Sequence, residues 1–174
     1  LLGLDKIITH RDGDVRDRSV VQSIFDDAKP EIVFHLAAQS LVKKSYADPK
    51  LTFDTNVGGS INVLDVARDC SSLKALTFIT SDKCYLNKEW LWGYRENDEL
   101  GGLDPYSASK AAAEIVFRAY AASFIDARND LGATTTRAGN VIGGGDWAAD
   151  RIVPDCIRAL EAKQPIRIRM PHAT

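Results

Sequence analysis

Apolar residues along the chain follow two alternating patterns. In the first, most positions of a short run are apolar, as in EIVFHLAA, which is typical of a strand in a sheet covered on both faces. In the second, apolar residues recur every three or four positions, which predicts an amphipathic helix. The predicted strands are 6–10, 31–38, 74–80, 133–140 and 165–169, and the predicted helices are 16–29, 51–69, 106–124 and 151–163.

The alternation of strands and helices predicts an α/β fold with a doubly wound parallel sheet, similar to a Rossmann fold. Ligands of such sheets bind outside the carboxyl ends of the strands, so the segments after 31–38, 74–80 and 133–140 are the candidates for a site. The pair Gly58-Gly59 lies inside a predicted helix, where each glycine costs roughly 1 kcal/mol relative to alanine. We therefore expect close packing at this pair.

Composition and charge argue against several classes of function. The chain has 174 residues, 45% of them hydrophobic, and a net charge of −2. Without a basic cluster we expect no nucleic acid partner, and without a long apolar run we expect no membrane span. Three widely spaced cysteines, Cys70, Cys84 and Cys156, argue against disulfides and a zinc site and predict a cytoplasmic protein.

A group of hydroxyl, phenol and ammonium side chains follows the strand 74–80. Tyr106 and Lys110 are four positions apart in a predicted helix, so they share a face and the ammonium favours the tyrosinate. Ser81, at the strand end, can share the same proton. This chemistry suits proton removal from a sugar alcohol while a hydride leaves for a nicotinamide. The alternative is an exposed pair without a role, because this spacing alone is a weak motif.

The combination resembles the extended short-chain dehydrogenase/reductase family. The matching motifs are GDVRD (13–17), FHLAAQ (34–39), TNVGGSINVLD (55–65), TSDKCY (80–85), YSASK (106–110) and RAGNVIGGGDW (137–147). Within that family the chain most resembles the nucleotide-sugar 4,6-dehydratases, and among these the enzymes that act on CDP-glucose. The segments TSDKCY (80–85), WGYREND (92–98), GNVIGGGDWA (139–148) and DRIVPD (150–155) together carry this closer resemblance.

The resemblance implies how the chain is divided. Residues 1–140 would form part of an NAD-binding Rossmann domain, and residues 141–174 would begin a substrate-binding region that returns to the sheet. Dinucleotide-binding folds of this kind normally open with a glycine-rich strand–turn–helix unit, and no glycines here have that spacing. We therefore expect a fold that is incomplete at both ends, without the first βαβ unit and without the C-terminal part.

The resemblance also implies which residues bind NAD. Asp14 would approach the adenine, and Ala37 and Ala38 would line the cofactor cleft, where small side chains allow close approach. A second interpretation of Asn56 is a polar helix residue that faces solvent. The implied cofactor contacts are Asp14, Val15, Leu36, Ala37, Ala38, Gln39, Asn56, Thr80, Tyr106 and Lys110.

For catalysis, the resemblance implies a triad of Ser81, Tyr106 and Lys110. Asp82 takes the position of the acid that protonates the departing C6 hydroxyl. Lys83 stands where the dTDP-glucose enzymes carry a glutamate base, and it either removes the C5 proton or stabilises the enolate. The implied substrate contacts are Ser81, Asp82, Lys83, Asn140 and Arg151, and no metal is implied.

The leading hypothesis is a nucleotide-sugar 4,6-dehydratase that converts CDP-glucose to CDP-4-keto-6-deoxyglucose with tightly bound NAD. Such an enzyme would serve deoxysugar biosynthesis, for example of the lipopolysaccharide O-antigen. One alternative is a nucleotide-sugar 4-epimerase of the same fold, which needs no acid at Asp82. The other is a non-catalytic NAD-fold binding protein. In the resembling family, helices equivalent to 51–69 and 106–124 form the interface of a homodimer, and we expect a homodimer or a dimer of dimers here.

Other residues near the predicted site have simpler interpretations. His35 lies in a buried run and is expected to pack in the core. Cys84 is expected to be a small residue at the strand end, although a reactive thiol is the alternative. The aromatic residues of the loop 84–105 are expected to pack on one another, and Ser107 and Ser109 are expected to be small spacers.

Overall fold

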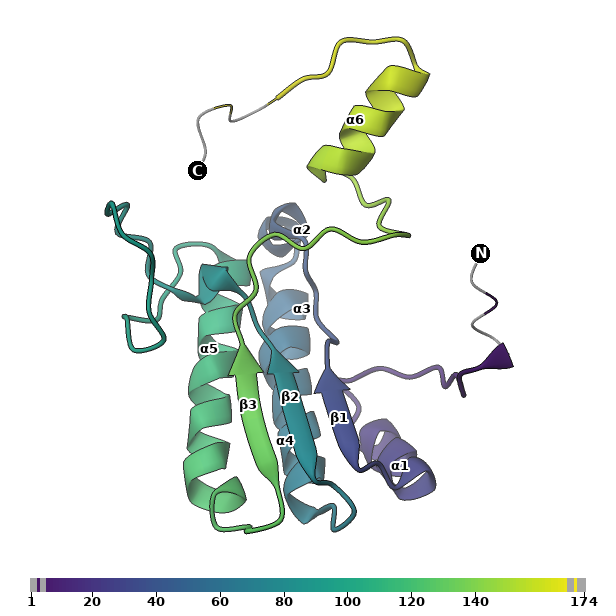
Figure 1. Ribbon diagram of the computed structural model, residues 1–174, viewed down its shortest axis with the longest axis vertical. Coiled ribbons are helices and arrows are strands. Elements are labelled where there is room, and N and C mark those ends of the chain that lie inside the picture. The colour runs from purple at the N-terminus through teal and green to yellow at the C-terminus, as the bar shows by residue number, and fades with distance from the viewer. Residues whose placement is uncertain (1–2, 4–5, 169–170, 172–174) are drawn as a thin grey trace. The chain divides into compact units, whose positions relative to one another are not determined.

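The computed structural model describes residues 3, 6–168 and 171. The chain divides into two compact units, Leu1–Gly139 (unit 1) and Asn140–Thr174 (unit 2). Unit 1 contains a parallel sheet with the strand order β1-β2-β3, made of Ile32–His35, Ala75–Ile79 and Gly132–Thr136 (Figure 1). The prediction of an α/β fold with a parallel sheet is therefore confirmed.

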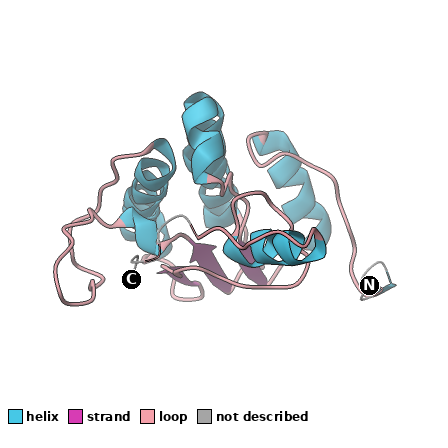
Figure 2. Ribbon diagram, turned by 90° about the horizontal axis from the view of Figure 1, so that it is seen from above, coloured by secondary structure: helices cyan, strands magenta, loops and turns pink. Residues whose placement is uncertain are grey.

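Three long helices of unit 1, α1 (Arg18–Ala28), α4 (Gly59–Asp69) and α5 (Pro105–Tyr120), lie on one face of this sheet (Figures 1 and 2). Their apolar stripes and the facing side chains of the strands form the core, because burying these surfaces together removes them from water. The largest buried apolar side chains of this core include Leu64, Leu73, Leu76, Phe78 and Ile125.

The predicted helix 51–69 is one continuous run made of three parts. It begins as α3 (Pro49–Phe53), widens into a π-helical turn at Asp54–Gly58, and continues as α4. The predicted helix 106–124 likewise ends in a π-helical turn, Ala121–Ile125, directly after α5. Such wide turns inside helices are frequent at functional sites.

Three further elements complete the described structure. The short helix α2 (Val42–Ala47) was not predicted, and a 3₁₀ turn, Asp82–Cys84, follows β2. Unit 2 contains the helix α6 (Ile152–Glu161), which lies within the predicted helix 151–163. In the part of the chain that the structure describes, every helix is too short or too polar to cross a lipid bilayer.

The opposite face of the sheet is not covered by the helices of unit 1. Ile32 and Phe34 on β1 are 60% and 63% exposed, whereas His35 and the neighbouring Phe78 are buried. The expectation that EIVFHLAA is buried on both sides is therefore wrong for unit 1. Alternate side chains of a strand point to opposite faces, and the three long helices cover only one of these.

Two predicted strands are absent from the described residues. Residues 6–10 form a short turn and an irregular segment, and Ile7 and Ile8 are exposed. Residues 165–168 are also irregular, and Arg169 lies outside the described residues. A strand forms only where a neighbouring backbone completes its hydrogen bonds, and the described residues place no such neighbour beside either segment.

The expectation of close packing is confirmed at one glycine of the pair. A Cβ atom on Gly59 would come within 2.5 Å of Val15 Cγ1, so only glycine lets the segment before α1 lie against α4. A Cβ atom on Gly58 would meet nothing within 4 Å. Asn62 strengthens this contact, because its amide nitrogen donates to the carbonyl oxygens of Val15 (3.0 Å) and Arg16 (2.9 Å).

Candidate active site at the carboxyl end of the sheet

The turn after β2 carries three of the predicted site residues. Ser81 is buried, and its hydroxyl accepts a hydrogen bond from the backbone N–H of Lys83 (3.2 Å), which caps the 3₁₀ turn. The same hydroxyl lies 3.0 Å from Asp82 Oδ1, to which it donates. Asp82 and Lys83 are exposed, so an acid and an ammonium face solvent beside a fixed hydroxyl.

The helix α5 delivers Tyr106 and Lys110 to the same end of the sheet. Asp104 caps the helix by accepting from the Ser107 backbone N–H (3.0 Å), and Pro105 follows as a favourable first residue. Tyr106 and Lys110 are 8% and 7% exposed, and Lys110 Nζ lies 3.4 Å from the carbonyl oxygen of Ile79, the last residue of β2. The interpretation of an exposed tyrosine–lysine pair is therefore wrong.

Burial sets the electrostatics of this region. Burial lowers the pKa of Lys110, and the nearby carboxylate of Glu114 raises it in part. Burial, followed by the charge of Lys110, lowers the pKa of His35 to about 4. The His35 ring lies 4.5 Å from that of Phe78, and its Nε2 is 3.3 Å from Ser60 Oγ. The prediction of a packed core histidine is confirmed.

A buried amide connects the segment after β1 to α5. Asn56, in the π-helical turn, is 2% exposed, which excludes its solvent-facing interpretation. Its side chain accepts from the Gln39 backbone N–H (2.7 Å) and donates to the Gln39 carbonyl (3.0 Å) and to Ser109 Oγ (2.8 Å). Ser109 donates in turn to the Tyr106 carbonyl (2.7 Å), so it is a network residue and not only a spacer.

The other residues predicted to contact NAD from this segment differ in exposure. Leu36 and Ala37 are exposed and Ala38 is half-buried. The Gln39 side chain bonds to other residues of the chain, because its amide nitrogen donates to Thr52 Oγ1 (2.9 Å) and to the Leu41 carbonyl (3.2 Å). Gln39 therefore holds the shape of the segment, while the two alanines leave space above it.

Asp14 lies in the segment that Gly59 and Asn62 hold against α4. Its carboxylate is bound by the Arg16 side chain and by the Arg16 backbone N–H (2.9 Å), and these hydrogen bonds lower the pKa of Asp14 to about 2. The carboxylate is therefore ionised at neutral pH, and it remains exposed with lone pairs available as acceptors.

Two predicted substrate contacts, Asn140 and Arg151, belong to unit 2. Asn140 is exposed, and Arg151 Nε lies 3.5 Å from Asp146 Oδ2 within the same unit. Their contact with substrate therefore stays a prediction.

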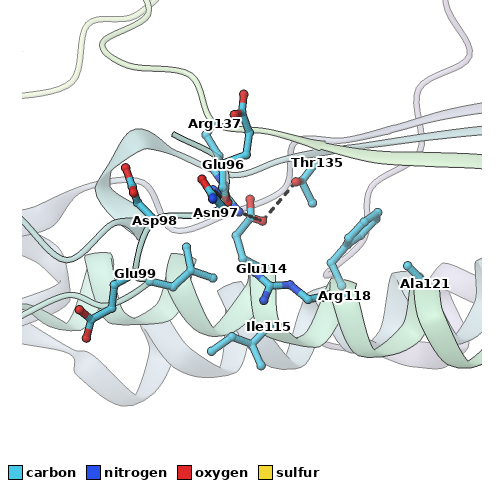
Figure 3. A pocket seen from close by; sticks show the side chains of 12 residues that line it. Glu96, Asn97, Asp98, Glu99, Glu114, Ile115, Arg118, Ala121, Thr135 and Arg137 are labelled. Atoms are coloured by element: carbon cyan, nitrogen blue, oxygen red, sulfur yellow. Dashed lines mark hydrogen bonds and ion pairs between the residues drawn. The ribbon is translucent and has the colours of Figure 1, made fainter. Parts of the chain in front are cut away.

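Sequence reasoning did not identify Glu114 and Arg137. Glu114 is buried on α5, and its Oε2 accepts from Arg137 Nη2 (2.9 Å) and from Thr135 Oγ1 (3.1 Å), as Figure 3 shows. Both residues line a pocket of about 670 Å³ bounded by α5, the end of β3 and residues 96–100. The available signal was the glutamate four positions after Lys110, on the same helical face.

The loop 84–105 packs on itself, as expected. The Tyr94 ring stacks on Tyr85 with centroids 5.1 Å apart, and Trp90 contacts both Tyr94 and Trp92 at 5.3 Å. Cys84 is fully buried, and burial raises the pKa of its thiol to about 11. The interpretation of Cys84 as a reactive thiol is therefore wrong.

Comparison with known proteins places this geometry in a family. Residues 3–159 match the family model described as GDP-mannose 4,6 dehydratase. The chain belongs to this family. Its members share the extended short-chain dehydrogenase/reductase architecture that the motifs indicated, so that prediction is confirmed.

Relatives within the family include a CDP-glucose 4,6-dehydratase of Salmonella typhimurium, which is 46% identical over 99% of this chain and 49% of the relative. Among solved structures, a Streptomyces venezuelae dTDP-glucose 4,6-dehydratase, DesIV, with NAD bound matches with a TM-score of 0.74. It is 25% identical over 87% of this chain and 44% of that one. A Thermus thermophilus UDP-glucose 4-epimerase in complex with NAD matches with a TM-score of 0.74 and 29% identity, over 88% of this chain and 49% of that one. The chain thus spans about half the length of these family relatives.

Proposed function

We propose that this chain is the catalytic part of an NAD-dependent nucleotide-sugar 4,6-dehydratase that acts on CDP-glucose. One observation carries the proposal: α5 brings Tyr106 and the buried Lys110 to the carboxyl end of β2, where the turn with Ser81, Asp82 and Lys83 begins. An acid beside the oxidation site is what elimination of a C6 hydroxyl needs. The identity to the Salmonella CDP-glucose enzyme supports the choice of substrate.

In the proposed reaction, tyrosinate 106 accepts the proton of the C4 hydroxyl, and the Lys110 ammonium stabilises this tyrosinate. Ser81 orients the same hydroxyl. The resulting 4-keto group acidifies the C5 proton, which a general base at the site accepts. Asp82 protonates the C6 oxygen, which then departs as water. Lys83 is exposed beside Asp82, and we assign it to stabilising the enolate.

The residues after β1 and before α1 fit a dinucleotide. Ala37 and Ala38 leave space at a strand end, and Gly59 permits the close approach that fixes the exposed Asp14 carboxylate, an acceptor for hydroxyl or amino groups. Leu36 and Val15 would pack beside the cofactor. Bound NAD supplies the hydride acceptor at C4 and the hydride donor at C6, as a cofactor that is regenerated in each turnover.

Mass spectrometry of the product tests this proposal. The complete gene product is incubated with NAD and, in separate reactions, with the CDP, dTDP, UDP and GDP sugars. We expect the mass of CDP-glucose alone to fall by one water. A product of unchanged mass but altered stereochemistry would identify a 4-epimerase, as in the Thermus relative. Unchanged substrate in every reaction would show that the dehydratase assignment is wrong.

We also propose a cytoplasmic homodimer. Helices α3, α4 and α5 pack together, and they expose apolar side chains, including Phe53, Ile61 and Ile115, that a second copy would cover. Light scattering of the complete gene product should give twice or four times the monomer mass. A strict monomer at micromolar concentration would contradict the proposal.

A further inference from the structure

We infer that the buried ion pair of Glu114 and Arg137 positions the proposed catalytic centre, by joining α5 to the turn after β2 and by balancing the charge next to Lys110. The inference rests on the proposed function, because it concerns how Tyr106 and Lys110 are kept ready for proton transfer. Neither residue belongs to the proposed triad, and we assign both a positioning role.

The contacts of Glu114 join three elements. Its Oε1 accepts from the hydroxyl of Thr80, the residue directly before Ser81, and its Oε2 accepts from Thr135 on β3 at 3.1 Å. Figure 3 shows this carboxylate rising from α5 toward the strand. The turn that carries Ser81 is therefore fixed relative to α5 by a side chain two helical turns beyond Tyr106.

The contacts of Arg137 add the loop 84–105. Its Nη1 donates to the Tyr85 hydroxyl (2.9 Å) and to the Glu96 carbonyl (2.9 Å), and its guanidinium lies 4.9 Å from the Tyr85 ring centroid. The backbone adjoining Arg137 is held as well, because Ala138 accepts from the Asp82 N–H (3.0 Å). The network thus holds both sides of the turn that carries the proposed acid.

The ion pair also has an electrostatic consequence. Glu114 lies one turn beyond Lys110, and its carboxylate favours the Lys110 ammonium. By the same Coulomb interaction, an uncompensated negative charge here would oppose formation of the proposed tyrosinate. Arg137 compensates this carboxylate. Among the described residues, His35 on β1 also faces Lys110, and burial lowers its pKa to about 4. The turn after β2, which packs against α5, brings the side chains of Asp82 and Lys83 to the same region. A change in the net charge of the Glu114–Arg137 pair should therefore be felt at the proposed tyrosinate.

Opposite shifts in a pH–rate profile test the inference. In the complete gene product, Arg137→Gln leaves the carboxylate uncompensated, so the acid limb of kcat/KM should move to higher pH. Glu114→Gln leaves the guanidinium uncompensated, so the limb should move to lower pH. We expect shifts of roughly half a pH unit or more, from one charge acting over several ångströms in a partly buried site.

The double variant E114Q/R137Q removes both charges and should return the limb toward its wild-type position. Arg137→Lys keeps the charge and should leave the acid limb in place. It should lower kcat, because one ammonium cannot hold Glu114 as Nη2 does while also donating to Tyr85 and Glu96 as Nη1 does. Arg118→Gln is the matched control, since Arg118 is an exposed arginine on the same helix and lines the same pocket. Arg118→Gln should change neither the position of the acid limb nor kcat.

Circular dichroism verifies that each variant is folded. Lost activity with an unmoved acid limb in both folded single variants, or shifts in the same direction, would show that the pair is only structural and would overturn the inference. If Arg137→Gln does not fold, Glu114→Gln alone decides through the sign of its shift. A wild-type protein that dehydrates no sugar nucleotide would instead refute the proposed function.

Discussion

Two arginines flank β3, and each is largely buried, with side-chain exposures of 19% for Arg128 and 12% for Arg137. Arg128, before the strand, binds main-chain carbonyls and the exposed Asp130. Arg137, after the strand, binds the buried carboxylate of Glu114 and the loop 84–105. The carbonyl oxygens that Arg128 contacts are those of Ala67, Arg68, Cys70 and Leu73.

The two sets of partners show that arginine serves a different purpose at each end of β3. The last carbonyls of a helix have no intrahelical partner, and Arg128 satisfies those at the end of α4. Arg137 instead compensates a charge on the helix that carries Tyr106 and Lys110. This division agrees with ligand binding at the carboxyl ends of parallel strands. The amino end of the sheet should therefore affect stability, and the carboxyl end should affect chemistry.

The largest expected effect lies at the carboxyl end. Tyr106→Phe removes the group proposed to accept the C4 proton, and general base catalysis contributes about 10² to 10⁴ in rate. We expect kcat of the complete gene product to fall by that factor, measured as product formed, while thermal unfolding stays near wild type. Turnover within a factor of two of wild type would remove Tyr106 from the mechanism.

At the amino end, Arg128→Met should cost stability without changing chemistry. It keeps much of the apolar stem but leaves helix-end carbonyls without partners, which costs about 2–4 kcal/mol in total. Urea unfolding of the complete gene product should show this loss, and kcat per folded molecule should stay unchanged. The exposed Arg118→Met serves as the control and should change stability by less than about 0.5 kcal/mol. A large fall in kcat for folded Arg128→Met would contradict the division between the two ends.

The response to pH should also arise at the carboxyl end. The folded-state pKa of His35 is about 4, below its ordinary value of 6.5, so the unfolded state binds a proton first as the pH falls. Stability is then fully present above pH 6.5 and is lost between pH 6.5 and about 4, by roughly 3 kcal/mol.

Chemical unfolding across that pH range measures this effect. In His35→Gln the free energy of unfolding should depend less steeply on pH, because the variant removes the titrating group and keeps a polar atom near Ser60. At the amino end, hydrogen bonds from Arg128 and Lys74 lower the pKa of Asp130 to about 2, so this carboxyl titrates below the same range. An equally steep slope in His35→Gln would assign the acid sensitivity to another group.

The sequence predicts those features of the fold and of the site that depend on local patterns. Apolar periodicity locates β1, β2, β3 and the long helices, because each pattern lies within one element. The motif around Tyr106 likewise locates the proposed chemistry on a helix start. The prediction of a strand at 6–10 is wrong because a strand needs a neighbouring backbone to bond with, and a local pattern does not report one.

Interactions between distant positions were beyond the same reasoning. Glu114 and Arg137 are 23 positions apart, and Asn56 and Ser109 are 53 positions apart. Each is an ordinary polar residue in its own segment and gains its role only when the helices and strands are packed. What sequence reasoning missed at the site are therefore the contacts between residues of different elements.

The smallest expected effect concerns the pair Gly58-Gly59, where the π-helical turn passes into α4. Gly59→Ala places a Cβ atom 2.5 Å from Cγ1 of Val15, a stiff branched side chain, so the segment with Asp14 must move, at a cost of about 1–3 kcal/mol. Gly58→Ala meets no atom within 4 Å and should stabilise the helix by about 0.5–1 kcal/mol.

Because Asp14 is proposed to contact the adenine, Gly59→Ala should also weaken NAD binding several-fold in isothermal titration, whereas Gly58→Ala should leave it unchanged. Equal stability and equal NAD affinity in the two variants would mean that the contact between Val15 and α4 supports neither the fold nor the cofactor site. A loss of affinity without a loss of stability would place this contact with the chemistry of the carboxyl end, since only the position of Asp14 would then have changed.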